Sequence, residues 1–334
     1  MGDLDQHGEF GIIDLFREAV VPGRSWVTTG IGDDCAVLDI GGGASLLATT
    51  DMLAEGVHFR RSGAPPWKLG WKSLAVNISD IAAMGGDPAA AFLALGLTPG
   101  LPERFLLEFR DGLLACAGEY GVDLLGGDTI RTRRELVFSL TLLGRAPSDQ
   151  VVTRGGARPG DRVMLGGPVG ESAAGLHILD GTVGEITAGD RRQLLAAHLE
   201  PRPQVALGRL LAAEGLARAM IDVSDGLLQD LGHVCRQSGT GADIDPALLP
   251  CSATLSRAAR SAGVDPVEWM LRGGEDYVLL CTVPPEREEQ ARRVCRDELG
   301  ADLHAVGEIT TGPAIRIRRD DAWVETDPAG FTHF

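Results

Sequence analysis

The sequence predicts an α/β protein made of two domains. The chain has 334 residues, a length that fits two domains of ordinary size. Short apolar runs of strand length alternate along it with longer segments in which apolar residues recur at helical spacing. A stretch rich in Gly, Pro and Arg, residues 145–160, separates the two halves. We therefore expect an N-terminal domain over residues 1–148 and a C-terminal domain over residues 149–334.

The elements of the first half follow from periodicity and from turn residues. Apolar residues at helical spacing predict a helix over residues 9–20. Two apolar runs, 36–40 and 45–49, flank the triple glycine 41–43, which predicts a β-hairpin because glycine tolerates positive φ. The rest of this half is expected to form strands over 89–97, 122–125 and 135–144 and helices over 66–84 and 101–120.

The helix over 66–84 is predicted to bury a polar face. Pro66 suits its first turn, and two glycines directly after residue 84 would end it. Asn77 and Asp80 are three residues apart and therefore share one face. Asp80 is flanked by Ile and Ala residues, and aspartate is rarely buried without a partner. We therefore favour a ligand role for Asp80 over a solvated position.

Three aspartates are expected at one end of the hairpin. Asp33 and Asp34 precede its first strand, Asp51 follows its second, and these two ends of an antiparallel hairpin are neighbours. Two like charges about 4 Å apart repel by roughly 4 kcal/mol at an effective dielectric of about 20, so such a cluster needs cations or shifted pKa values. Oxygen ligands of this kind suit Mg²⁺. The alternative is that these aspartates only start turns and cap strands.

Other candidate residues of the first half lie in expected loops. A predicted strand leads into Gly127 and Asp128, where glycine would let the backbone approach a phosphate, although most Gly-Gly-Asp tripeptides are plain turns. His58 lies seven residues after Asp51 and could reach the same cleft. Arg154, in the linker, is a candidate phosphate contact, although a linker arginine is more often exposed to solvent.

The second half is predicted to contain a further acidic turn. A strand over 219–223 would carry Asp222, Ser224 and Asp225 at its exit, directly before a helix. A helix N-cap would account for one of these polar residues but not for all three. The other expected elements are helices over 191–198, 205–214, 227–237 and 286–299, strands over 161–165, 315–318 and 323–325, and a strand after the Gly-Gly-Glu-Asp turn at 273–276.

Composition narrows the classes of function. The net charge of −16 argues against non-specific binding to nucleic acid or to an anionic membrane, although metal ions can invert the field within a site. The chain has no run of 18 apolar residues, so no membrane span is expected. Its N-terminus lacks the basic-then-apolar order of a secretion signal. Its six cysteines lack CxxC spacing, so we expect a protein of the reducing cytoplasm.

The acidic turns favour electrostatic over covalent catalysis, because no His or Cys nucleophile stands out beside them. Phosphoryl transfer needs mainly positioning and metal ions that neutralise charge. The chain has neither the GxxxxGK[ST] nor the GxGxxG pattern. A nucleotide such as ATP would therefore have to be held by carboxylates and several Mg²⁺ ions.

Six motifs resemble those of thiamine-monophosphate kinases and occur in the same order. They are GIGDDCAVL, TTDMLAEGVHF, LAVNISDIAAMGGDP, LLGGDT, IDVSDGLLQDLGH and RGGEDYVLL. The resemblance covers nearly the whole chain. It implies a PurM-like fold of two α/β domains, with N-terminal strands that contribute to a barrel at a homodimer interface. It also implies direct transfer of the γ-phosphoryl group of ATP to thiamine monophosphate, giving thiamine diphosphate and ADP.

The resemblance further implies roles for individual residues. The Mg²⁺ ligands would be Asp34, Thr49, Thr50, Asp51, Asp80, Asp128, Asp222 and Asp225, of which the catalytic ones would be Asp34, Asp51, Asp128 and Asp222. The nucleotide contacts would be Gly127, Asp128, Arg154 and Ser224, and the contacts to the thiamine substrate would be His58, Glu275 and Phe331. Tyr120 is the nearest candidate for stacking on adenine. Val278 stands where many relatives carry an acid, and we expect it to point into the core.

Two alternative functions compete with this one. Another ATP-dependent enzyme of the same superfamily is disfavoured. Selenophosphate synthetases need a reactive residue in an N-terminal segment, whereas residues 1–30 lack cysteine. Hydrogenase-maturation enzymes need a C-terminal cysteine, whereas this chain ends in Thr-His-Phe. The second alternative is a non-catalytic module that binds divalent ions, and turnover would distinguish it.

Overall fold

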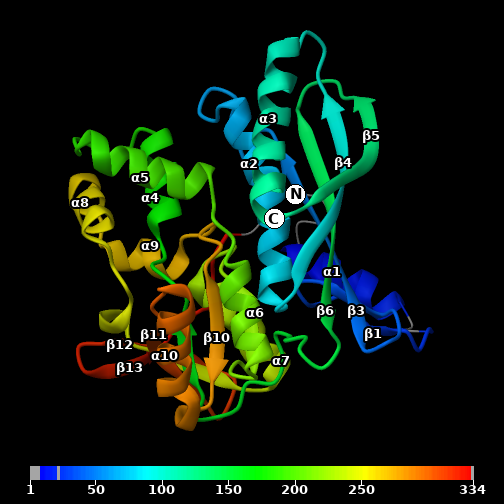
Figure 1. Cartoon of the computed structure of the whole chain (residues 1–334). Coiled ribbons are helices and arrows are strands. Elements are labelled where there is room, and N and C mark those ends of the chain that lie inside the picture. Colours follow the sequence, from blue (N-terminus) through cyan, green and yellow to red (C-terminus); the bar gives the residue numbers. More distant parts are fainter. Residues whose placement is uncertain (1–7, 21–22, 332–334) are drawn as a thin grey trace.

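The computed structural model describes residues 8–20 and 23–331. Within these ranges the chain forms two halves, each built around one β-sheet with helices packed on it (Figure 1). The first sheet has six strands in the order β1-β2-β3-β6-β4-β5, and the second has seven in the order β13-β12-β9-β11-β7-β10-β8. In the part of the chain so described, no helix is long and apolar enough to cross a membrane.

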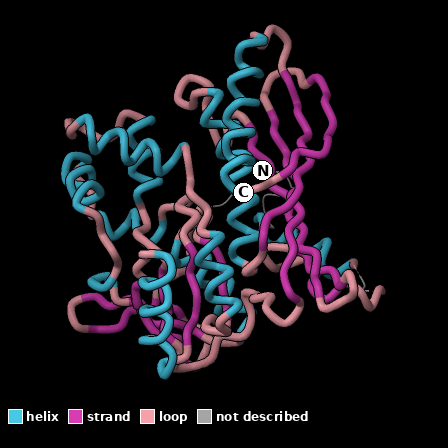
Figure 2. The backbone as a smooth tube through the Cα atoms, viewed as in Figure 1, coloured by secondary structure: helices cyan, strands magenta, loops and turns pink. Residues whose placement is uncertain are grey.

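The N-terminal half contains the elements predicted for it and one short strand, β1, that the sequence did not predict. Its strands are β1 (Val27–Thr29), β2 (Ala36–Asp39), β3 (Ala44–Ala54), β4 (Asp87–Leu97), β5 (Asp123–Arg131) and β6 (Val137–Pro147), and its helices are α1 (Gly8–Ala19), α2 (Pro66–Ala83) and α3 (Glu103–Tyr120). Helix α3 connects the parallel strands β4 and β5, and β6 lies antiparallel between β3 and β4. Figure 2 shows the long strands of this sheet in magenta beside the helices in cyan.

The C-terminal half is a second mixed sheet with a larger set of helices. Its strands are β7 (Arg162–Leu165), β8 (Ala219–Asp222), β9 (Gly241–Ile244), β10 (Leu279–Val283), β11 (His304–Thr310), β12 (Ile315–Arg319) and β13 (Ala322–Glu325). Its helices are α4 (Glu171–Leu179), α5 (Ala188–Leu199), α6 (Val205–Ala213), α7 (Leu227–Ser238), α8 (Ala253–Ala262), α9 (Pro266–Arg272) and α10 (Glu288–Leu299). The sequence did not predict β9, β11, α8 or α9. Strands β9 and β11 each contain a glycine that interrupts the apolar alternation, and both form by pairing with distant strands.

The predicted hairpin forms, but its second strand is longer than expected. Strands β2 and β3 pair antiparallel with Ala36 opposite Ala48, and the three glycines between them have positive φ. Strand β3 continues to Ala54 because it pairs along its whole length with β6. Asp51 therefore lies inside a strand, and the prediction that it follows the strand end was wrong.

Strand β5 also differs from the prediction. It runs on through the Gly-Gly-Asp tripeptide to Arg131 as the edge strand beside β4. Gly127 pairs with Leu93, and a Cβ at Gly127 would lie 1.7 Å from the carbonyl oxygen of Leu93. Glycine at this position serves the close approach of two strands. Asp128 therefore lies within an exposed strand, and its predicted place at a strand end was wrong.

Helix α2 lies between the two halves. It contacts α3, β3, β4 and β6 of its own half and α5, α6 and β8 of the other half. Two glycines allow its close contact with α3: a Cβ at Gly70 would lie 1.9 Å from the Phe109 oxygen, and one at Gly112 would lie 1.8 Å from the Trp67 oxygen. Packing on both sides buries α2 almost all round and brings its polar residues to the boundary between the halves.

Candidate functional site

Three carboxylates from distant parts of the sequence converge at this boundary. Asp34 lies just before β2, Asp80 lies on α2, and Asp222 ends β8. One oxygen of each lies within 4.8 Å of an oxygen of the other two. We call these three residues the acid cluster. The sequence predicted their convergence, and no element of secondary structure links them directly.

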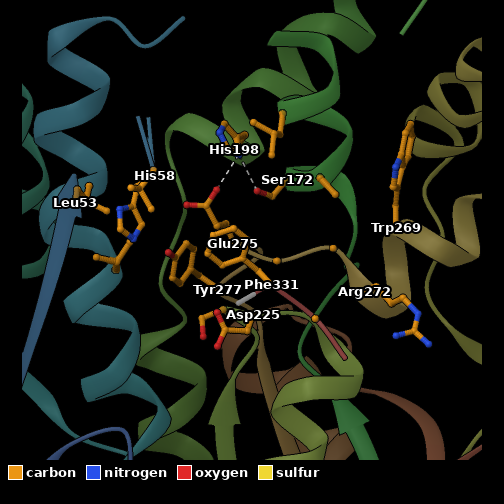
Figure 3. Close-up of a pocket in the computed structure, with 18 of the residues that line it drawn as sticks. Leu53, His58, Ser172, His198, Asp225, Trp269, Arg272, Glu275, Tyr277 and Phe331 are labelled. Atoms are coloured by element: carbon orange, nitrogen blue, oxygen red, sulfur yellow. Dashed lines mark hydrogen bonds and ion pairs between the residues drawn. The ribbon is translucent and has the colours of Figure 1, made fainter. Parts of the chain in front are cut away.

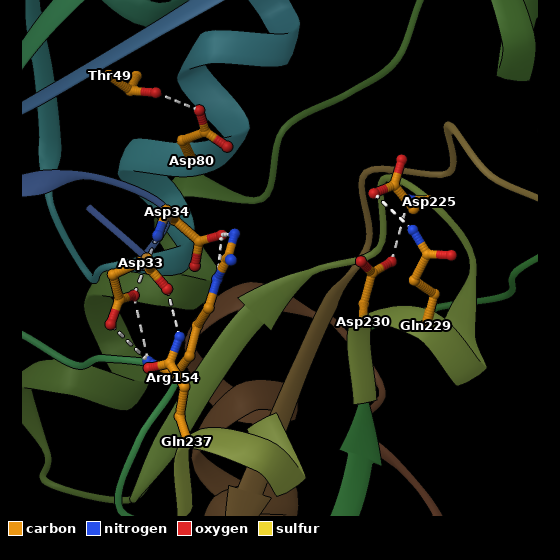
Figure 4. Close-up of polar contacts among 10 residues, drawn as sticks. Asp33, Asp34, Thr49, Asp80, Arg154, Asp225, Gln229, Asp230 and Gln237 are labelled. Atoms are coloured by element: carbon orange, nitrogen blue, oxygen red, sulfur yellow. Dashed lines mark hydrogen bonds and ion pairs between the residues drawn. The ribbon is translucent and has the colours of Figure 1, made fainter. Parts of the chain in front are cut away.

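Hydrogen bonds orient two members of the acid cluster (Figure 4). The hydroxyl of Thr49 donates to Oδ2 of Asp80 at 2.5 Å. Arg154 donates to Oδ1 of Asp34 from Nε at 3.0 Å and from Nη2 at 2.5 Å. The backbone N–H of Arg154 also lies 3.2 Å from both carboxylate oxygens of Asp33. Arg154 is therefore held against the acid cluster and is not exposed in the linker.

The acid cluster lacks enough positive charge. Burial raises the pKa of Asp34, although the charge of Arg154 opposes this. Burial and three neighbouring carboxylates raise the pKa of Asp80 well above its usual value. Burial and the charge of Asp34 raise the pKa of Asp222 to about 7. Oδ2 of Asp34 and Oδ2 of Asp222 are both buried without a hydrogen-bond partner. Orphaned oxygens among oxygen-only donors suit a hard cation such as Mg²⁺.

Two further carboxylates lie beside the acid cluster. The backbone N–H of Asp51 donates to Oδ1 of Asn77 at 3.2 Å, which ties β3 to α2. Burial and the charges of Asp225 and Asp34 raise the pKa of Asp51 to about 6. Asp225 precedes α7, and its Oδ2 accepts from Nε2 of Gln229 at 3.1 Å. The charges of Asp225 and Asp34 thus act on Asp51, although neither Asp51 nor Asp225 belongs to the acid cluster itself.

A cavity of about 600 Å³ opens beside these carboxylates. Its lining includes the predicted site residues Asp51, Asp80, Ser224, Asp225, His58, Glu275 and Phe331. It also includes Trp269 and Leu176, which the sequence did not single out. Figure 3 shows side chains from both halves of the chain facing this space. The cavity is therefore lined both by predicted metal ligands and by predicted contacts to the thiamine substrate.

Glu275 is held at one wall of the cavity by two residues that the sequence analysis did not assign to the site. Its Oε1 lies 2.6 Å from Nζ of Lys72, and its Oε2 lies 3.3 Å from Nδ1 of His198. Burial acts to raise the pKa of Glu275, but the charge and hydrogen bond of Lys72 together with the two neighbouring histidines outweigh it, and the pKa is lowered. Burial and Lys72 lower the pKa of His198 to about 4, so this imidazole is neutral near pH 7.

The neighbouring Ser172 does not complete a hydrolase triad. Its hydroxyl lies 3.2 Å from Nδ1 of His198, the same ring nitrogen that faces Glu275 (Figure 3). A Ser-His-acid triad needs the serine on one ring nitrogen and the acid on the other. The geometry therefore favours a binding role for this group of residues.

The segment that carries Phe331 is hydrogen-bonded to the residues around Asp225. Gln229 uses both ends of its amide: Oε1 accepts from Gly330 N at 2.8 Å, and Nε2 donates to Phe331 O at 3.0 Å. The N–H of Phe331 donates to the carbonyl oxygen of Asp225 at 3.0 Å. Asp230, also missed by the sequence analysis, accepts from the N–H of Asp225 at 3.1 Å. No local sequence pattern marks Gln229 or Asp230 for these contacts.

Some predicted residues lie elsewhere. Asp128 is exposed on β5, three strands away from β3, and at ordinary strand spacing this is about 14 Å from the row of Asp51. The hydroxyl of Thr50 donates to the carbonyl oxygen of Leu140, on the opposite face of β3 from Thr49, so the two threonine side chains do not point to the same place.

The structure also shows where Tyr120 and Val278 lie. Tyr120 packs edge-on against Trp71 and lines a second cavity, so it does not face the acid cluster. Val278 packs against the core of the C-terminal half, as predicted.

Known proteins resemble both halves. Residues 32–146 match the N-terminal domain of AIR synthase related proteins, and residues 158–320 match their C-terminal domain. The chain is 42% identical over 328 residues to the thiamine-monophosphate kinase of Escherichia coli K12, and the match covers 98% of each chain.

Solved structures extend this similarity to the fold. The structure of AaThiL complexed with AMPPCP and TMP has a TM-score of 0.87 and 33% identity, and the match covers 100% of this chain and 99% of that one. The thiamine-monophosphate kinase of Stenotrophomonas maltophilia K279a has a TM-score of 0.76 and 35% identity, with 94% and 98% covered. Sequence and fold point to one family along the full length.

Proposed function

Because this chain belongs to the thiamine-monophosphate kinase family, we propose that it transfers the γ-phosphoryl group of ATP directly to thiamine monophosphate, giving thiamine diphosphate and ADP. This is the last step in making thiamine diphosphate. The observation that carries the proposal is the continuity of one cavity from Asp51 and Asp80 to Glu275 and Phe331. A direct transfer needs both phosphates in one space, with the reacting oxygens in line.

We assign the binding of several Mg²⁺ ions to the acid cluster together with Asp51 and Asp225. When bound, Mg²⁺ would neutralise phosphate charge and hold the attacking and leaving oxygens in line. Thr49 orients Asp80, and the two orphaned oxygens of the acid cluster support a cation between them. Arg154 donates two of its five N–H groups to Asp34, so others are available to a nucleotide phosphate.

We assign the thiamine side to Glu275, His58 and Phe331. Thiamine carries a cationic ring, and an ionised carboxylate at the cavity wall attracts positive charge. Phe331 is about half exposed at the same cavity, so its ring can stack on a flat heterocycle. Nδ1 of His58 accepts from the N–H of Ala54 at 3.0 Å, which fixes the ring beside the cavity.

We propose that the chain works as a homodimer assembled on the β5 edge. Strand β5 is an exposed edge that carries apolar side chains, among them Leu125 and Ile130, which are each 60% exposed. Exposed apolar edges of this kind pair with another chain. In such a dimer Gly127 and Asp128 would meet the partner subunit, which accounts for a nucleotide-binding motif on this strand. Light scattering should give twice the chain mass, and Leu125→Lys should lower it.

We also propose a cytoplasmic location. All six cysteines are free and five of them are buried, which suits a reducing compartment.

The test of the proposed function is a coupled ADP assay with thiamine monophosphate, thiamine and selenide as acceptors. ADP should form with thiamine monophosphate and Mg²⁺, and thiamine diphosphate should appear in equal amount. Thiamine should be refused, because a direct transfer uses a phosphate oxygen as nucleophile. ADP release with selenide, or with no acceptor at all, would sink the assignment.

A further inference from the structure

The chain contains two lysines among its 31 basic residues, and both lie on α2. Lys68 and Lys72 are one helical turn apart but have different surroundings. The side chain of Lys68 is 30% exposed, pairs with Glu200 and lies over the ring of Trp67. The side chain of Lys72 is 3% exposed. In a chain whose other basic residues are almost all arginines, a compact ammonium group stands at a buried position, where the larger guanidinium would need more room.

The two oxygens of Glu275 have different partners. Lys72 from the N-terminal half lies 2.6 Å from Oε1, and His198 from α5 lies 3.3 Å from Oε2. An ionised carboxylate has about four acceptor sites. Each oxygen has one protein partner, so acceptor sites remain for a ligand in the cavity that Glu275 lines. Glu275 is therefore presented to a ligand as an oriented anion.

The backbone of the loop that carries Glu275 is also held in place. Glu275 and Tyr277 both have positive φ, at 63° and 52°, a strained conformation for residues other than glycine. Their N–H groups are held by the loop that carries Ser224: Glu275 donates to Ser224 O at 2.6 Å, and Tyr277 donates to Val223 O at 2.8 Å. Between them Oδ2 of Asp276 accepts from Gly170 N at 2.7 Å. The loop is fixed from two sides, so only the carboxylate end of Glu275 is left to be positioned.

We propose that Lys72 is the positioning residue for Glu275, with His198 as its second support. This inference rests on the proposed function and deepens it. Lys72 holds the carboxylate ionised and turned to the cavity, where it receives the N–H donors or the positive charge of the thiamine substrate. Lys72 and Asp80 are on one rigid helix. Helix α2 therefore positions both Glu275, which contacts the substrate, and Asp80, which contacts the metal.

The kinetic test compares Lys72→Met with the matched control Lys68→Met on the same helix. Lys72→Met should raise KM for thiamine monophosphate about tenfold or more and change KM for ATP less than about twofold, as expected when one buried charge partner is lost. Lys68→Met should change neither value. The double variant Lys72→Met/Glu275→Gln should be no worse than Glu275→Gln alone, because the two residues act as one unit.

A second measurement does not depend on activity. Protein made with lysine carrying ¹³C at Cε should give two lysine signals, assigned with Lys68→Met. Glu275→Gln should shift the Lys72 signal and leave the Lys68 signal in place, without any ligand. Thiamine monophosphate should then move the Lys72 signal in the wild-type protein, whereas AMPPCP should not.

The outcomes separate the inference from the proposed function. A folded Lys72→Met with unchanged KM for thiamine monophosphate, or a Lys72 signal indifferent to Glu275→Gln, overturns the inference while wild-type turnover stands. Equal rises in both KM values would make Lys72 a merely structural residue and would also overturn it. If Lys72→Met fails to fold, the double variant, which leaves no buried charge unmatched, and the lysine signals still decide the question.

Discussion

Arg154 donates two hydrogen bonds to a single oxygen, Oδ1, of Asp34. The other oxygen of Asp34 is buried without a partner, as is Oδ2 of Asp222. One guanidinium therefore faces a group of carboxylates whose pKa values burial and mutual repulsion raise. The first two predictions follow from this shortage of positive charge.

Magnesium should stabilise the protein. A cation bound at 100 times its Kd adds about 2.7 kcal/mol to the free energy of unfolding, so Tm should rise by several degrees. Differential scanning calorimetry with and without millimolar MgCl₂, after chelation, measures this shift. Asp222→Asn should lose most of the rise. A wild-type Tm that magnesium does not move would count against a shared cation site.

Asp51→Asn and Asp222→Asn should each lower kcat by about two orders of magnitude or more, because a neutral amide binds a hard cation far less well than a carboxylate. Circular dichroism should show an unchanged fold. Asp39→Asn is the control, since Asp39 lies on the same hairpin but only accepts from Gly41 N in the turn, and its turnover should match the wild type. Wild-type rates in the Asp51 and Asp222 variants would contradict the assignment.

Gly127→Ala should destabilise the protein by more than about 3 kcal/mol, because its Cβ would lie 1.7 Å from the backbone oxygen of Leu93 and β5 would have to move away from β4. Gly126→Ala is the matched control: its Cβ would lie 3.8 Å from the ring of Phe92, an ordinary contact. Urea denaturation of both variants tests this. Equal stabilities would mean that β4 and β5 are not in close contact.

Stability should depend on pH through Asp276. Burial raises its pKa to about 7 from the usual 3.8, although two backbone N–H groups oppose this shift. Between these values the folded state binds more protons than the unfolded state, so stability falls as pH rises from about 4 to 7. Asp276→Asn removes this loss. The stability of the variant relative to wild type should therefore grow by about 1–3 kcal/mol from pH 5 to pH 7. A difference that stays constant with pH in urea denaturation would refute this.

Gln229→Met should loosen the segment that carries Phe331. The change removes the acceptor for Gly330 N and the donors to Phe331 O and Asp225 Oδ2. We expect KM for thiamine monophosphate to rise about threefold to tenfold, because two or three net hydrogen bonds are lost, and Tm to fall slightly. Gln193→Met, which removes a donor to Glu171 and the acceptor of the Thr254 hydroxyl but no contact of the Phe331 segment, is the control and should leave KM unchanged. An unaltered KM would mean that the segment is held in another way.

Much of the fold could be predicted because its signals are local. The hairpin follows from three glycines between two apolar runs, and α2 follows from Pro66 and two terminal glycines. The errors came from pairing with distant strands. Strand β3 runs past Asp51 because β6 lies beside it, and β5 runs past Asp128 because β4 does. A strand end that depends on a partner strand has no marker in its own sequence.

The candidate site shows the same division. Asp80 was identified because a carboxylate in an apolar helix face needs a partner, which is a local argument. Lys72, His198 and Gln229 were missed because their partners are distant in the sequence. The partners of Lys72 and Gln229 are more than 100 positions away and that of His198 more than 70, and a buried lysine or glutamine carries no local sign of its partner.

By itself the sequence determined most of the elements of the N-terminal half, the candidate acidic residues and the class of chemistry, because backbone preferences and charge act over a few residues. The tertiary structure decided which carboxylates meet: Asp34, Asp80 and Asp222 converge, whereas Asp128 lies on a far strand. It also decided that Lys72 faces Glu275. Such meetings depend on how α2 packs between two sheets, and that packing is set by the summed contacts of the whole chain.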